Sequence, residues 1–176
     1  MINYIKIYDI IGFKICWLLC AFCSVWEQPY LGPIVTVLFI MIHLFIVNFN
    51  KKDIQIICIA IFCGFIIDSL FSIFGFIDYQ GGIFTKYNLA PLWILSMWAG
   101  FALTMLYSLE SIRTKYFISS ILGFIGGPLS YSAGVRIGSL EINTQFTYIL
   151  LALAWGLIVP LLFQHQMIQV RASIVS

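Results

Sequence analysis

The chain has 176 residues and a formal net charge of +2, and 62% of its residues are hydrophobic while only 9% are charged. Because soluble domains carry about 25% charged residues, a chain this apolar cannot cover a water-soluble globule with polar surface. The small net charge offers no basic patch, so nucleic-acid binding is excluded, and a mean hydropathy of +1.03 predicts an integral membrane protein.

Six long apolar segments follow one another along the chain, separated by short polar or aromatic stretches. Each segment approaches the length of about 20 residues that a membrane-spanning helix needs. The segments are continuous rather than alternating, and backbone amides in lipid must be bonded internally, so helices are expected rather than barrel strands. We therefore predict an all-α integral membrane protein with one domain, residues 1–176, in which six transmembrane helices cover 8–26, 33–49, 54–74, 91–109, 116–137 and 146–163.

The Lys and Arg residues are distributed unequally between the two sides of such a bundle. Six helices place both chain ends on one side, which then holds seven Lys or Arg residues against two on the other side. The seven are Lys6, Lys14, Lys51, Lys52, Arg113, Lys115 and Arg171, and the two are Lys86 and Arg136. The positive-inside rule predicts that both termini are cytoplasmic. A cleaved signal peptide is the alternative for the first helix, but Lys14 interrupts its apolar stretch and no small-residue cleavage site follows.

The longest loop, residues 75–90, is expected on the outer side. Within 76–87, two aromatic-rich stretches flank Gly81 and Gly82, which is a β-hairpin signal. The alternative is an irregular loop whose aromatic side chains rest on lipid headgroups.

Asp68 lies inside the third apolar segment, where an ionisable group is costly unless it is paired or hydrated and therefore marks a candidate functional site. Counting about 1.5 Å per residue puts Asp68 about 9 Å below the outer boundary, with Ser96 and Tyr131 at a similar depth and Arg136 nearer the rim. We predict that Asp68, Ser96, Tyr131 and Arg136 form a polar binding pocket open to the outer side. The alternative is a buried polar cluster that only fixes helix packing.

The fifth segment is rich in glycine. Gly123 with Gly127 and Gly134 with Gly138 are pairs of small residues four positions apart, which allow a neighbouring helix to approach closely, and Pro128 removes one helical hydrogen bond. We interpret Gly123, Gly127, Pro128, Gly134 and Gly138 as packing residues, with the broken helix of a transporter as the alternative.

The polar and cysteine residues within the apolar segments do not have the spacing of a metal or catalytic site. The five cysteines all fall inside predicted helices and are interpreted as small buried hydrophobes, and no metal or cofactor is expected. No nucleophile–base set is evident, so an enzyme is less favoured than a binding protein. Lys14 and His43 are placed about 9 Å inside the inner helix ends. Lys14 is interpreted as snorkelling to the inner headgroups and His43 as hydrogen-bonded within the bundle.

Four stretches of the chain carry distinctive glycine, proline and aromatic residues: Leu31-Gly32-Pro33, Gly64-Phe65-Ile66-Ile67-Asp68-Ser69-Leu70, Leu89-Ala90-Pro91-Leu92-Trp93 and the Gly-Gly-Pro-x-x-Tyr-x-x-Gly-x-Arg-x-Gly segment from Gly126 to Gly138. In these stretches the chain resembles a family of small bacterial inner-membrane proteins classed as a domain of unknown function. The chain departs from the family at Leu106-Tyr107-Ser108, where the resemblance implies Asn-His-Ser. The resemblance implies a location in the bacterial inner membrane and no established activity.

Three functions remain open at the level of sequence. The favoured one is binding or transport of a lipid or small polar molecule through the outer polar pocket, with membrane lipids as partners. The alternatives are a membrane-embedded accessory subunit, whose protein partner the sequence does not name, and a lipid-modifying enzyme.

Overall fold

The computed structural model describes the backbone of residues 2–175 and the side chains of residues 4–164. Within this range six α-helices dominate, with two short strands and two 3-10 helices. The elements are α1 (Ile2–Val25), α2 (Leu31–Ile46), α3 (Lys51–Ile73), β1 (Ile77–Tyr79), η1 (Phe84–Tyr87), α4 (Leu92–Tyr107), η2 (Glu110–Ile112), α5 (Tyr116–Ile137), β2 (Leu140–Ile142) and α6 (Phe146–Val175).

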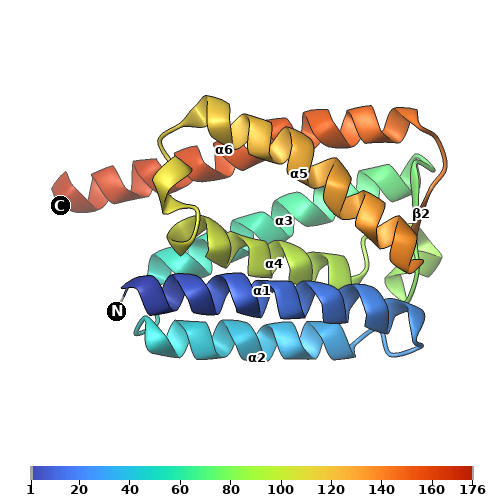
Figure 1. Ribbon diagram of the computed structural model, residues 1–176, viewed down its shortest axis with the longest axis horizontal. Helices are drawn as coiled ribbons and strands as arrows, with labels where there is room; N and C mark the ends of the chain where they lie inside the picture. Colours follow the sequence, from blue (N-terminus) through green and yellow to red (C-terminus); the bar gives the residue numbers. More distant parts are fainter. Residues whose placement is uncertain (1, 176) are drawn as a thin grey trace.

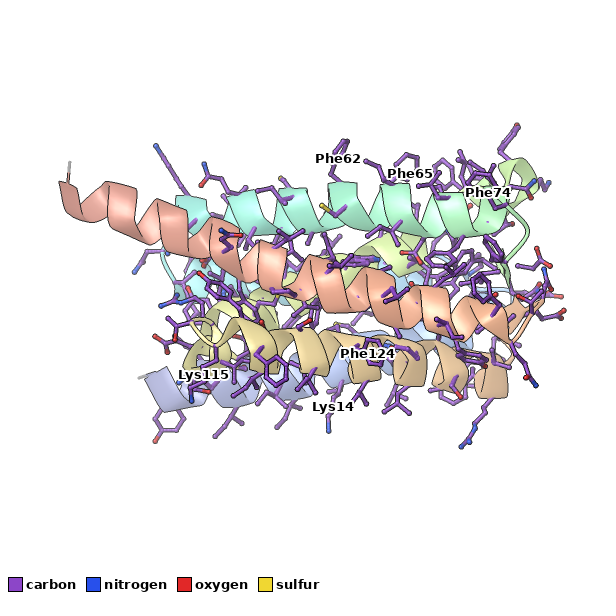
Figure 2. The ribbon with its side chains drawn as sticks, turned by 90° about the horizontal axis from the view of Figure 1, so that it is seen from above. Lys14, Phe62, Phe65, Phe74, Lys115 and Phe124 are labelled. Atoms are coloured by element: carbon purple, nitrogen blue, oxygen red, sulfur yellow. The ribbon has the colours of Figure 1, made fainter. Side chains whose placement is uncertain are left out.

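Four helices are long and apolar enough to span a membrane: Tyr4–Val25, Lys51–Ile73, Tyr116–Ile137 and Phe146–Gln164. The apolar helices α2 and α4 have 16 residues each, or about 24 Å at 1.5 Å per residue. Large apolar side chains face outward along the bundle, and Figure 2 shows Phe62 and Phe65 projecting from α3 away from the other helices. Such a surface suits lipid rather than water.

The six helices lie roughly parallel to the long axis of the molecule (Figure 1). The α1–α2 pair lies on one side and the α5–α6 pair on the other, with α3 and α4 between them. Both chain ends lie at the same end of the bundle, and the β-strands and η1 lie at the opposite end (Figure 1). We call these the inner and outer ends.

Local sequence explains where several helices begin and end. The Asn50 side chain caps α3 by accepting a hydrogen bond from the Lys52 amide at 3.0 Å. Helix α2 ends at Ile46 rather than at the expected residue 49, because Asn48 and Phe49 have left-handed φ angles of 55° and 52°. Gly138 closes α5 with a φ of 85°, the conformation that glycine adopts most readily after a helix.

Helices α1 and α6 extend well beyond the expected bounds, whereas α2 and α3 start only two and three residues early. Helix α1 begins at Ile2 rather than at residue 8, and α6 continues to Val175 rather than ending at residue 163. The earlier start of α1 shifts Lys14 from near an inner helix end to the middle of its helix.

The hairpin expected at 76–87 is not formed. Strand β1 pairs antiparallel with β2, the segment that follows α5, with Asp78 opposite Glu141. Although Gly81 and Gly82 have the positive φ angles of a hairpin turn, Phe84–Tyr87 winds into η1 and so cannot pair with β1. The strand pair ties the loop after α3 to the connection between α5 and α6.

Candidate functional site

Asp68 is completely buried in the outer half of the bundle and accepts hydrogen bonds from three aromatic side chains. The Tyr79 hydroxyl donates to Oδ1 at 2.6 Å, the Trp98 indole N–H donates to Oδ2 at 2.6 Å, and the Tyr131 hydroxyl also donates to Oδ1. The donors come from β1, α4 and α5, so one carboxyl group on α3 joins four elements. We call these four residues the outer cluster.

The environment of Tyr79 disfavours its ionisation. Burial first, and the adjacent Asp68 carboxylate second, raise the pKa of the Tyr79 hydroxyl well above its ordinary value of 10.0. Tyr79 therefore stays a hydrogen-bond donor to Asp68 at neutral pH.

The four residues predicted to form the polar pocket do not all meet. Asp68 and Tyr131 are joined by a hydrogen bond. The Ser96 hydroxyl instead donates to the Leu92 carbonyl oxygen of its own helix at 2.8 Å. Arg136 is exposed, and none of the ion pairs among residues 4–164 includes it. The outer cluster is therefore held together by hydrogen bonds between side chains of the same chain, and neither Ser96 nor Arg136 takes part in it.

A groove of about 630 Å³ lies beside the outer cluster, between α1, α4 and α5. It runs along much of the bundle, from Trp93 and Leu140 at the outer end to Ser108 and Leu109 at the inner end. Tyr131 lines it as well as binding Asp68, so the groove and the outer cluster share a wall.

Aromatic rings form much of the wall on the α6 side of the groove. The Trp98 and Trp155 rings stack with centroids 4.4 Å apart, and the edge of the Tyr131 ring faces Trp155 at 6.4 Å. The Trp155 indole N–H is buried and has no hydrogen-bond acceptor among the described residues. Across the groove, the Trp17 indole N–H on α1 donates to the Ser130 hydroxyl on α5 at 3.1 Å.

The glycines of α5 differ in the space that surrounds them. A Cβ atom on Gly123 would lie 2.1 Å from the Trp155 carbonyl oxygen, and one on Gly127 would lie 2.4 Å from the Trp155 ring, so α6 packs against these two positions. A Cβ atom on Gly134 would meet Leu140 at 3.0 Å. These three glycines and Gly126 all line the groove, but only at Gly126 would a Cβ atom face open space. Helix α5 itself continues through Pro128.

A second polar cluster at the inner end was not predicted from the sequence. His43 Nδ1 lies 2.8 Å from Asp9 Oδ1, His43 Nε2 lies 3.5 Å from Asp53 Oδ2, and the Tyr107 hydroxyl donates to Asp53 Oδ2 at 2.8 Å. Asp9, His43 and Asp53 are buried. This inner cluster joins α1, α2, α3 and α4, and no side-chain partner was found for Asp9 Oδ2 in the described range.

The inner cluster could have been suspected from the rule that singled out Asp68. Asp9 also falls inside a predicted helix, where an ionisable group needs a partner. The predicted third helix starts at residue 54 and so leaves Asp53 outside it, but α3 begins at Lys51 and buries Asp53.

The inner cluster contains three residues of types that can ligate metals, but in the described part of the chain they were not found to form a metal site. No group of three or more His, Cys, Asp or Glu residues able to hold a metal ion was found among the described residues. Cys16, Cys20 and Cys23 are buried in α1, and the Cys20 thiol lies 3.7 Å from the Thr36 hydroxyl. The expectation that all five cysteines are buried is wrong for Cys58, which is exposed, and for Cys63, which is half-buried.

Comparisons with known proteins assign a family without assigning an activity. No curated protein and no solved structure matched the chain. A family model described as "Protein of unknown function (DUF2878)" matches residues 6–161, a range that contains all six helices in whole or in part and both polar clusters. The chain therefore belongs to this family.

Proposed function

We propose that the protein binds, and in the membrane transports, a lipid or a lipid-like amphiphile in the groove between α1 and α5. The observation that carries this proposal is the groove itself, an apolar cavity of about 630 Å³ that follows much of the long axis of the bundle. A site lined mainly by apolar and aromatic side chains suits a hydrocarbon chain better than a small polar solute.

The closed outer cluster supports a lipid ligand rather than a polar molecule at Asp68. All three donors to its carboxylate come from the protein, and Asp68 is fully buried, so a solute would have to displace a strong set of hydrogen bonds. We infer that the outer cluster holds the wall of the groove in place through Tyr131, whereas the ligand lies in the groove.

We further propose a multi-pass arrangement in the bacterial cytoplasmic membrane with both termini in the cytoplasm. The seven-to-two distribution of Lys and Arg supports this orientation, as does the presence of both chain ends at one end of the bundle. Reporter fusions at the C-terminus and at Gly81 would test it. A periplasmic C-terminus would contradict the arrangement.

Filling the groove from Gly126 tests the proposed binding directly. A Gly126→Phe substitution places a benzyl group in open space, so the fold should persist while bound lipid is excluded. Ile125→Phe is the matched control, because Ile125 is exposed and does not line the groove. Native mass spectrometry of protein extracted with lipid should show lipid retained by the wild type and by Ile125→Phe and lost from Gly126→Phe. Equal retention by all three proteins would refute the proposal.

A further inference from the structure

We propose that the groove is selective for amphiphiles with an anionic headgroup, and that Lys14 is the residue that binds this headgroup. The inference rests on the proposed function and adds the charge of the ligand. It follows from the charges around the groove, the depth of Lys14 and the hydrogen-bond donors beside it.

The charge of the groove has one sign. Among the described residues that line it, Lys14 is the only charged side chain, and no aspartate or glutamate is present. Lys14 is exposed and takes part in none of the ion pairs found among residues 4–164. An unpaired ammonium at the edge of an apolar cavity is complementary to an anion and unfavourable to a cation.

Lys14 lies deep along its helix, so the lack of an ion-pair partner among residues 4–164 is significant. Lys14 lies near the middle of the 24-residue α1, about 15 Å along the helix from Tyr4, where its apolar span begins, at 1.5 Å per residue. A lysine side chain is shorter than this distance, so snorkelling does not carry the ammonium to the headgroup layer of an undisturbed bilayer. Figure 2 shows Lys14 reaching away from the helices about midway along the bundle. A charged group at this depth normally marks a substrate or ion pathway.

Neighbouring polar groups of the groove are donors as well. Trp17, one helical turn from Lys14 on the same face of α1, donates its indole N–H to the Ser130 hydroxyl. No acceptor for the Ser130 hydroxyl proton was found among the described residues, and Ser130 also lines the groove. A phosphate or carboxylate near Lys14 could accept hydrogen bonds from both the ammonium and this hydroxyl. In a zwitterionic headgroup the Lys14 ammonium would also repel the headgroup's own ammonium, so a headgroup with a net negative charge is favoured.

The position of Lys14 suggests that the ligand moves along the groove rather than binding at one membrane surface. The groove continues from Lys14 towards Trp93 at the outer end and towards Ser108 at the inner end. An anionic headgroup that leaves either headgroup layer would therefore meet Lys14 halfway, while its hydrocarbon chain remains in the lipid. Lys14 would lower the cost of carrying that charge through the membrane interior.

The test uses the intact protein in nanodiscs that contain equal amounts of phosphatidylglycerol and phosphatidylethanolamine. Lipid that remains bound after transfer to detergent is identified by native mass spectrometry. Because Lys14 attracts a headgroup with a net negative charge and repels the ammonium of phosphatidylethanolamine, the wild type should retain phosphatidylglycerol over phosphatidylethanolamine by about tenfold. Lys14→Gln should lose this preference but still retain lipid, and Lys14→Arg should keep it.

The control is Lys86→Gln, which removes the same charge from η1 at the outer end and should leave the preference unchanged. Absence of a preference in the wild type would overturn the inference without needing any variant. A preference that survives Lys14→Gln would place anion recognition elsewhere and overturn it too. After either of these two outcomes, lipid retention that is lost in Gly126→Phe would still support the proposed function. If the wild type retained no lipid at all, both the proposed function and the inference about Lys14 would be wrong.

Discussion

The contact between α5 and α6 can be tested by adding one methyl group at two positions of the same helix. At Gly123 the new Cβ atom would lie 2.1 Å from the Trp155 carbonyl oxygen, closer than real atoms approach, and the obstacle is backbone. At Gly126 the same atom would meet nothing within 4 Å. Gly123→Ala and Gly126→Ala are therefore a matched pair with opposite surroundings.

The expected difference follows from two terms. Both substitutions gain the same helix propensity of about 0.5–1 kcal/mol, which cancels when the variants are compared. Overpacking costs about 1–3 kcal/mol and applies to Gly123→Ala alone. Since 1 kcal/mol shifts the Tm of a chain of this size by roughly 2–4 °C, Gly123→Ala should melt about 2–12 °C below Gly126→Ala.

Thermal unfolding in mild detergent, followed by tryptophan fluorescence, suits this comparison because Trp155 lies at the contact. Far-UV circular dichroism at low temperature would establish that both variants retain the helical fold. If the two variants melted at the same temperature, α5 and α6 would be further apart than described, and the argument from close glycine packing would be wrong.

The two clusters and their surroundings give further predictions. Tyr131→Phe removes a hydrogen bond to Asp68 and should lower the unfolding free energy by about 1.5–3 kcal/mol, while Arg136→Gln should change it by less than about 0.5 kcal/mol. A denaturant titration of both variants would check this, and an equal effect of the two would restore Arg136 to the outer cluster. Because the pKa of Tyr79 is raised in the folded protein, stability is retained below pH 10 and should fall above it, where the unfolded chain releases the proton. Tyr79→Phe should reduce this fall in melting curves recorded between pH 9 and about 11, and an unchanged slope would contradict the assignment. His43→Ala leaves two buried carboxyl groups without their shared partner and should cost about 3–5 kcal/mol in the same titration, so a neutral effect would show that the inner cluster is dispensable.

Counting residues along a helix predicts depth well because the rise per residue is constant. It put Asp68 and Tyr131 at one level, and these two side chains are hydrogen-bonded. It could not predict direction around the helix axis, which depends on how the helices pack. Ser96 bonds to its own helix, and the group that reaches Asp68 from α4 is Trp98, two positions further along.

The strand pairing and the inner cluster could not be predicted because each depends on residues that lie far apart in the sequence. Strand β1 finds its partner after α5, and no local pattern in 76–87 indicates that pairing. Asp9 and Asp53 meet His43 only once three helices have packed, so the inner cluster is a product of tertiary structure. The apolar helices themselves, by contrast, were predictable from hydropathy, because a continuous apolar segment in lipid satisfies its backbone hydrogen bonds as a helix, whereas barrel strands alternate.

The two polar clusters fasten the same pair of helices at opposite ends. Helix α3 contributes Asp53 at the inner end and Asp68 at the outer end, and α4 contributes Tyr107 and Trp98. Sliding α3 along α4 would break hydrogen bonds at both ends, so the two helices form a rigid central frame. The walls of the groove are attached to this frame at different ends, α1 through the inner cluster and α5 through the outer one. Widening the groove would therefore require α1 and α5 to rotate apart about their opposite ends. Such a rotation would have to break the Trp17–Ser130 hydrogen bond, which joins the two helices across the groove.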